Sequence, residues 1–260
     1  MSDAPGLRDL AVATAREAAA MVVRMRAEGV RVAGTKSSEI DVVTEADRAA
    51  EELVRDRLLG ARPGDGLFGE EGSRVEGASG VRWIVDPIDG TVNYLYGLPV
   101  FAVSIAAEVD GVIVAGAVVE APTGRVFSAT LGGGAYVDGA RIACRAQMPE
   151  AQSLVATGFN YERHVRERQA AAVARMLPRV RDIRRMGSCA LDLCALAQGR
   201  IDGYVEEGAE IWDDAAGGLI AREAGAVVEV RTGASGKRLI VAAPAHSFSR
   251  FATLTAACGF

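Results

Sequence analysis

The chain has 260 residues, in which 29 lysines and arginines stand against 34 aspartates and glutamates, for a formal net charge of −5. A nucleic-acid-binding face needs a clustered basic excess, so this balance argues against a nucleic-acid partner. No apolar run approaches the roughly 20 residues that span a bilayer, and we expect no membrane partner. The four cysteines form no Cys-x-x-Cys pair, which is typical of buried thiols in a reducing compartment and predicts a cytoplasmic protein.

The first elements are predicted to be helices. Apolar residues recur at helical spacing over residues 7–28, which predicts a long amphipathic helix. Residues 36–43 are expected to be irregular or briefly extended. Thr44 and Asp47 have the spacing of a capping box with aspartate in the glutamate position, and they predict a second helix that ends near residue 59.

The most informative segment is residues 83–93, which read Trp-Ile-Val-Asp-Pro-Ile-Asp-Gly-Thr-Val-Asn. The apolar run over residues 81–85 predicts a buried strand. Pro87 lacks a backbone N–H and has a fixed φ, so we expect the strand to stop before it. Asp86 and Asp89 then lie at the mouth of that strand.

The chain is expected to turn at Gly90 and to start a helix near Thr91 and Asn93. Two acids beside a helix N-terminus can hold divalent cations and a phosphate together. The alternative is a turn that only caps a helix, but a cap needs one Asx side chain and this segment has a surplus. Glu70 and Glu71 lie between two glycines, where a loop is expected to present their carboxylates without burying them.

The remaining chain is predicted to be a layered α/β (α+β) fold. We call residues 86–90, with Asp86, Asp89 and Gly90, the acidic turn. Hairpin signals separate three strands after this turn, and strands and helices alternate from about residue 153. We expect two packed subdomains, residues 1–145 with most candidate metal ligands and residues 146–260 with the others. The predicted strands cover residues 101–108, 112–120, 125–130, 154–157, 181–185, 202–205, 226–230 and 239–242, and the predicted helices cover residues 163–177, 188–198, 212–224 and the end of the chain.

Two further acids lie at predicted helix starts. Asp213 and Asp47 each have a simpler interpretation as a residue that stabilises the positive end of a helix. Several carboxylates at the ends of elements nevertheless make a hard-cation site plausible, because Mg²⁺ prefers oxygen ligands. The candidate set then includes Glu70, Asp86 and Asp89 as well.

Other phosphatase chemistries fit the sequence poorly. Cys194 and Arg200 have the Cys-x5-Arg spacing of cysteine phosphatases, but a helical pattern lies between them where a loop of N–H groups is needed. An aspartyl-phosphate enzyme would need two acids closer together than those of the acidic turn. His164 and His246 are the only histidines and are expected at the surface, so a histidine nucleophile or a histidine-based zinc site is not expected.

Three motifs, in this order, resemble the inositol monophosphatase family. They are Gly69-Glu-Glu, residues 83–93 and Trp212-Asp-x-Ala-Ala-Gly. The similarity covers nearly the whole chain, from Lys36-Ser-Ser and Asp41 onward, and residues 185–193 are similar to the bacterial inositol-1-monophosphatase branch. The resemblance implies a layered α-β-α-β-α sandwich of the sugar-phosphatase type, dependence on two or three Mg²⁺ ions, sensitivity to lithium and a homodimer.

The resemblance also implies a ligand set. Glu70, Asp86 and the backbone carbonyl of Ile88 would bind a first metal ion. Asp86, Asp89 and Asp213 would bind a second ion, and a third, weaker ion would depend on Glu70.

Catalytic and substrate roles follow from the same resemblance. Glu70 and the pair of Thr91 and Asp47 would orient and deprotonate the attacking water. The N–H groups of Gly90 and Thr91 would receive the phosphate, and Glu206 would hold a sugar hydroxyl. Cys189 replaces the alanine of many relatives, which leaves substrate detail open. The implied substrate-binding set is Asp89, Gly90, Thr91, Gly187, Ser188, Cys189, Glu206 and Asp213.

The expected function is hydrolysis of myo-inositol 1-phosphate or a related small polyol phosphate by metal-activated water. The same site acting on histidinol phosphate, fructose 1,6-bisphosphate or a 3′-phosphoadenosine nucleotide is the alternative. No basic residue is evident near Glu206, which favours a hydroxyl over a second phosphate, whereas the amine of histidinol phosphate would also suit an acid. A non-catalytic regulatory partner is a further alternative, although its mutually repelling acids would then have no purpose.

Overall fold

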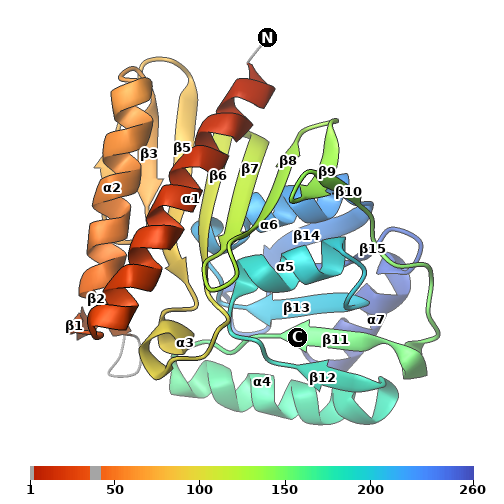
Figure 1. The fold of residues 1–260 in the computed structure, drawn as a ribbon. Coiled ribbons are helices and arrows are strands. Elements are labelled where there is room, and N and C mark those ends of the chain that lie inside the picture. The colour runs from red at the N-terminus through yellow and green to blue at the C-terminus, as the bar shows by residue number, and fades with distance from the viewer. Residues whose placement is uncertain (1–2, 36–41) are drawn as a thin grey trace.

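Two large β-sheets, a two-stranded sheet and three layers of helices build the fold of this computed structural model, which describes residues 3–35 and 42–260 (Figure 1). Lys36, Ser37, Ser38 and Asp41, which carry part of the family resemblance, lie outside the described residues. The helices are α1 (Ala4–Glu28), α2 (Glu45–Ala61), α3 (Thr91–Tyr96), α4 (Arg163–Met176), α5 (Cys189–Ala197), α6 (Ile211–Glu223) and α7 (Phe248–Cys258).

The strands form three sheets. An eight-stranded sheet has the order β10-β9-β8-β7-β6-β5-β3-β4, a five-stranded sheet has the order β12-β11-β13-β15-β14, and β1 pairs with β2. The strands are β1 (Val32–Thr35), β2 (Val42–Thr44), β3 (Gly66–Gly69), β4 (Arg74–Val75), β5 (Val81–Asp89), β6 (Ala102–Val109), β7 (Val112–Glu120), β8 (Arg125–Thr130), β9 (Gly134–Val137), β10 (Ala140–Ile142), β11 (Leu154–Thr157), β12 (Asp182–Arg184), β13 (Gly203–Glu207), β14 (Ala226–Thr232) and β15 (Arg238–Pro244).

The five layers follow from four buried apolar clusters. α1 and α2 cover one face of the eight-stranded sheet, and α5 and α6 cover its other face. The opposite sides of α5 and α6 pack on the five-stranded sheet, whose outer face is covered by α4 and α7. The layered α-β-α-β-α prediction is therefore confirmed. The division into subdomains near residue 145 stays a prediction.

Local signals place most elements as expected. Thr44 and Asp47 form a capping box at the start of α2, with both reciprocal hydrogen bonds present. The strand predicted over residues 181–185 is present as β12, which is the edge strand of its sheet. Among the described residues, no helix is long and apolar enough to cross a bilayer.

The expectation that a strand stops before Pro87 is wrong. β5 continues to Asp89, and its pairing with β6 shifts register between Asp86 and Asp89. A proline is tolerated at such an irregularity because no ladder hydrogen bond needs its missing N–H. The shift places Asp86 and Asp89 at the C-terminal end of β5, where the candidate active site lies.

The middle helical layer lies unusually close to the eight-stranded sheet. A Cβ on Gly116 of β7 would lie 3.1 Å from the Cα of Ala216 in α6. Small residues on both elements permit this approach, so the first turn of α6 reaches the end of β5.

Candidate active site

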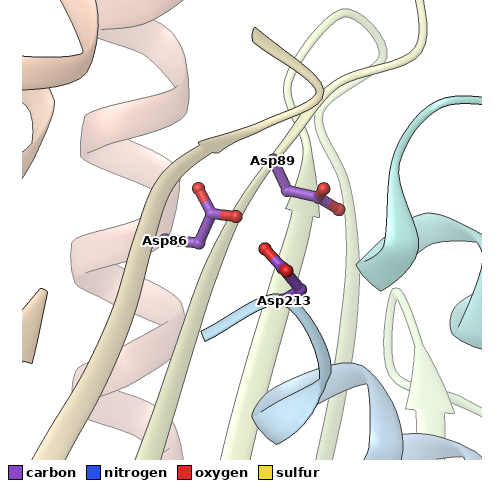
Figure 2. A group of neighbouring side chains, drawn as sticks. All are labelled: Asp86, Asp89 and Asp213. Atoms are coloured by element: carbon purple, nitrogen blue, oxygen red, sulfur yellow. The ribbon is translucent and has the colours of Figure 1, made fainter. Parts of the chain in front are cut away.

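Three carboxylates converge at the junction of the eight-stranded sheet and α6. Asp86 and Asp89 come from the end of β5, and Asp213 comes from the first turn of α6 (Figure 2). One carboxylate oxygen from each residue lies within 4.8 Å of the others. Only hard oxygen donors meet here, which is the donor set that Mg²⁺ or a similar cation takes.

The environment of Asp86 disfavours its charge. Its side chain is 1% exposed, and burial raises its pKa well above the usual value, while negative charge on neighbouring carboxylates raises it further. One stabilising contact is the backbone N–H of Ile88, which donates to Asp86 Oδ1 over 3.0 Å. A bound cation would remove the repulsion that the metal-free site contains.

Asp89 is held by the start of α5. The Ser188 hydroxyl and the Ala190 N–H donate to its Oδ2 over 2.5 and 2.7 Å, and the Cys189 N–H donates to its Oδ1 over 3.2 Å. Burial nevertheless raises the pKa of Asp89 to about 7, against the lowering effect of the Ser188 and Ala190 hydrogen bonds. Ser188 and Cys189 therefore hold Asp89 by hydrogen bonds, and both also line the cavity described below.

Asp213 is oriented by the start of its own helix. The N–H of Glu210 donates to Asp213 Oδ2 over 2.6 Å, in a capping box that opens α6. Burial raises the pKa of Asp213 well above its usual value, and the charge of Glu70 raises it further. Asp213 therefore both caps the start of α6 and belongs to the cluster of carboxylates.

β3 and β5 are parallel neighbours, so their C-terminal ends lie side by side. Glu70 directly follows β3 and therefore lies near the acids at the end of β5. Its N–H donates to the Val85 carbonyl over 3.1 Å, which places it beside Asp86. The loop does not bury Glu70 and Glu71 fully, in agreement with the expectation, and both residues are half-buried. The packing of this loop against α2 is the reason.

A residue that the sequence analysis missed, Glu51 of α2, holds this loop. Its Oε2 accepts from the Glu71 N–H over 2.7 Å and its Oε1 accepts from the Ser73 N–H over 2.8 Å. A Cβ on Gly69 would overlap the Glu51 carboxylate, so glycine is required there. A buried acid two turns into a helix carries no local signal of this role.

Thr91 connects the acidic turn to α2. Its hydroxyl lies 3.1 Å from Asp47 Oδ1 and 3.0 Å from the Ile88 carbonyl. Asp47 is fully buried, and its Oδ2 accepts from the Thr44 N–H over 2.7 Å and from the Thr44 hydroxyl over 2.5 Å. The expected pairing of Thr91 with Asp47 is present.

Gly90 allows the sharp turn into α3. Its φ is +100°, and a Cβ there would lie 2.9 Å from the Val100 carbonyl and 3.1 Å from that of Gly187. Asn93 joins the same segments, since its side-chain amide donates to the carbonyls of Val100 and Met186 over 2.7 and 2.8 Å. The acidic turn and the segment of residues 186–189 are therefore one connected structure.

A cavity of about 270 Å³ opens over the cluster. Asp47 is absent from its lining and lies behind Thr91. Every other candidate residue lines it, namely Glu70, Asp86, Ile88, Asp89, Gly90, Thr91, Gly187, Ser188, Cys189, Glu206 and Asp213.

Two basic side chains also line this cavity, so the expectation of no basic residue near Glu206 is wrong. Arg185 lowers the pKa of Glu206, although burial, the largest effect, raises it. Lys237 lines the same cavity and pairs with Glu162 over 2.7 Å. Arg185 opens the family-like segment of residues 185–193, but that segment does not indicate that its side chain lies near Glu206. Lys237 belongs to no motif, and packing brings both residues there.

The comparisons with known proteins decide the family. The sequence matches the profile of the inositol monophosphatase family over residues 6–257. The chain belongs to the inositol monophosphatase family. Inositol-1-monophosphatase of Mycobacterium leprae is 48% identical over 263 residues, covering 93% of this chain and 90% of that relative.

Solved structures of this family have the same fold. Mycobacterium tuberculosis SuhB has a TM-score of 0.86 at 42% identity, covering 99% of this chain and 98% of that one. Extragenic suppressor protein SuhB from Bartonella henselae has a TM-score of 0.88 at 34% identity, covering 96% of this chain and 98% of that one. The protein is therefore a phosphatase of a metal-dependent family, and its acidic cluster is able to hold metal.

Membership of this family agrees with the rejection of cysteine and histidine chemistry. Cys194 is buried within helix α5, where no phosphate-binding loop exists. His164 and His246 are both exposed. All four cysteines are free thiols, as expected.

Proposed function

We propose that this phosphatase hydrolyses myo-inositol 1-phosphate or a closely related small polyol phosphate and requires Mg²⁺. The observation that carries the proposal is the convergence of three carboxylates, of which those of Asp86 and Asp89 are buried, in one cavity that a further acid, Glu206, also lines. Relatives named inositol-1-monophosphatase support this choice of substrate.

The donor set fits the cations that the family implies. Glu70, Asp86 and the Ile88 carbonyl would hold one Mg²⁺, Asp86, Asp89 and Asp213 would hold another, and a third would depend on Glu70. Cations bound there would lower the pKa of water and offset the negative charge of the phosphate. The raised pKa values of Asp86, Asp89 and Asp213 support this assignment, because such a cluster is costly without a positive charge.

The protein groups around the cluster would position the attacking water. Thr91 has one hydroxyl proton and two acceptors, the Asp47 carboxylate and the Ile88 carbonyl. If that carbonyl serves as a ligand, the proton goes to Asp47, and a lone pair of the hydroxyl is left to accept from water. Glu70 would then take a proton from this water, and Gly90 and Thr91 would receive the phosphate with their N–H groups.

Glu206 would accept hydrogen bonds from the hydroxyls of the substrate. Arg185 and Lys237 keep fructose 1,6-bisphosphate among the alternatives, since either could meet a second phosphate. Histidinol phosphate and a 3′-phosphoadenosine nucleotide also remain to be compared. Cys189 lines the same wall and would contribute to the choice among them.

A homodimer is part of the proposal. Tyr96, Leu98 and Met186 are 78%, 53% and 45% exposed, which is high for large apolar side chains. Asn93 of α3 connects the segment after this helix to the segment of Met186 by hydrogen bonds to the carbonyls of Val100 and Met186. Sedimentation equilibrium of the wild type and of a Leu98→Glu variant would test this surface, and a wild-type monomer at micromolar concentration would contradict the proposal.

The decisive experiment measures inorganic phosphate release from the four substrates named above, with and without Mg²⁺. We expect Mg²⁺-dependent turnover led by myo-inositol 1-phosphate, inhibition by Li⁺ but not by equal Na⁺, and loss of turnover in Asp86→Asn. If another ester is hydrolysed fastest, that ester replaces myo-inositol 1-phosphate as the proposed substrate, and the proposed metal site is kept. No turnover of any ester, with Mg²⁺ still bound, would favour a regulatory partner that has kept the fold.

A further inference from the structure

Glu206 has a buried partner on its own strand. Side chains two residues apart lie on the same face of a strand, so Tyr204 and Glu206 are neighbours on β13. The Tyr204 hydroxyl donates to Glu206 Oε2 over 2.6 Å. Tyr204 is fully buried, whereas Glu206 is half-buried and lines the cavity.

The position of Tyr204 is set by packing. Its ring belongs to the apolar cluster between the five-stranded sheet and α5, which includes Leu193, Leu196 and Ile240. Burial raises the pKa of Tyr204 well above its usual value, and the neighbouring Cys189 and Glu206 raise it further. The hydroxyl therefore keeps its proton and acts only as a fixed donor to Glu206.

Gly158 closes the other side of the Glu206 carboxylate. β11 and β13 are parallel with Thr157 opposite Val205, so Gly158, which directly follows β11, lies beside Glu206. A Cβ on Gly158 would overlap all three carboxyl atoms of Glu206. The backbone of Gly158 does not have a positive φ, so its constraint is the space that the carboxylate occupies.

We propose that Tyr204 and Gly158 together fix the Glu206 carboxylate and so determine the selectivity of the cavity for hydroxyl-bearing phosphate esters. Tyr204 occupies Oε2, which leaves Oε1 to accept from a substrate hydroxyl. A carboxylate already held in one orientation loses less rotamer freedom when it binds a ligand, so its hydrogen bond contributes more to affinity. Both are positioning residues that act through Glu206. The inference rests on the proposed function in its use of polyol phosphates.

The kinetic test compares Tyr204→Phe with the wild type on myo-inositol 1-phosphate and on p-nitrophenyl phosphate, whose leaving group has no hydroxyl to donate. Loss of a fixed hydrogen bond should raise KM for the inositol ester about 2- to 10-fold, with kcat within about twofold. The kinetics of p-nitrophenyl phosphate should be unchanged. Equal losses on both substrates would show a structural role and overturn the proposal.

Three further variants sharpen this test. Gly158→Ala should give the same selective loss, because the carboxylate must move to admit the new methyl group. Tyr204→Phe should have little further effect in a Glu206→Gln background, whereas additive losses would overturn the proposal. Tyr94→Phe is the matched control: Tyr94 is equally buried, its hydroxyl donates to the Val22 carbonyl over 3.4 Å outside the cavity, and both activities should be preserved.

Crystal structures of the wild type, Tyr204→Phe and Gly158→Ala give a readout independent of activity. We expect the Glu206 carboxylate to be displaced or split between conformers in both variants. An unmoved carboxylate in both would overturn the inference whatever the kinetics. If the wild type prefers another ester, the proposed substrate fails, while these structures still decide whether Tyr204 and Gly158 position Glu206.

Discussion

The hydroxyl of Ser188 donates a 2.5 Å hydrogen bond to Asp89, a residue 99 positions earlier in the chain. This contact joins the start of α5, which forms one wall of the cavity, to the end of β5, which carries the acids. A wall residue thus also orients a proposed metal ligand. The geometry of the acidic cluster and that of this cavity wall therefore cannot change independently.

Ser188→Ala should weaken both folding and metal binding. Loss of a hydrogen bond to a charged group costs about 1.5–3 kcal/mol, and loss of a residue that orients a metal ligand lowers metal affinity about 10- to 100-fold. The Mg²⁺ concentration for half-maximal activity measures the second effect. Ser79→Ala is the matched control, since Ser79 donates to the buried Asp65 over 2.6 Å away from the cavity. An equal rise in Mg²⁺ requirement in both variants would contradict the prediction.

Glu51→Gln should lower activity through Glu70. In the wild type both Glu51 oxygens accept backbone N–H groups, and the amide of glutamine would place a donor against one of them. We expect kcat/KM to fall by about 10-fold or more as the loop and Glu70 lose their fixed position. Glu52→Gln removes an exposed charge from the adjacent position and should leave activity unchanged.

Thr91→Val should remove the hydroxyl that contacts Asp47 and that, in the proposed function, orients the attacking water. A misplaced nucleophile costs about 100-fold in kcat, while the affinity for substrate should change little. Thr91→Ser keeps the hydroxyl and should retain most activity, which makes it the control for the lost methyl group. Equal losses in both variants, measured by steady-state phosphate release, would mean that the hydroxyl has no positioning role.

The metal-free protein should lose stability as pH rises from 6 to 8. The pKa values of Asp86, Asp89 and Asp213 are raised in the folded state, with Asp89 at about 7, so between their unfolded values near ~4 and these folded values the folded state binds more protons. Stability is then greatest at the acid end of this window and falls as the folded protein must release its protons.

Denaturant unfolding in EDTA at pH 6 and pH 8 measures this effect, and a change of about 2–4 kcal/mol is expected. Excess Mg²⁺ should reverse the loss at pH 8, and Asp86→Asn should reduce the pH dependence by removing one repelling charge. Unfolding free energies that are equal, or that rise with pH, would show that the cluster is not strained without metal.

The sequence by itself determined the local parts of this protein. The capping box of Thr44 and Asp47, the hairpins, and the alternation of strands and helices after residue 153 depend on residues a few positions apart, where propensity and spacing act directly. The segment of residues 83–93, which contains the acidic turn, was recognisable for the same reason. Its pairing irregularity at Pro87 was not, because a register shift depends on the partner strand β6.

Only the tertiary structure decided how distant groups are brought together, beyond what the family resemblance implied. Asp213 reaches the acids of β5 because small residues let α6 approach β7, and Glu51 supports Glu70 because α2 packs on β3. Arg185 lies near Glu206 for a similar reason. Such contacts depend on how whole elements pack and cross, and spacing along the chain carries no information about them.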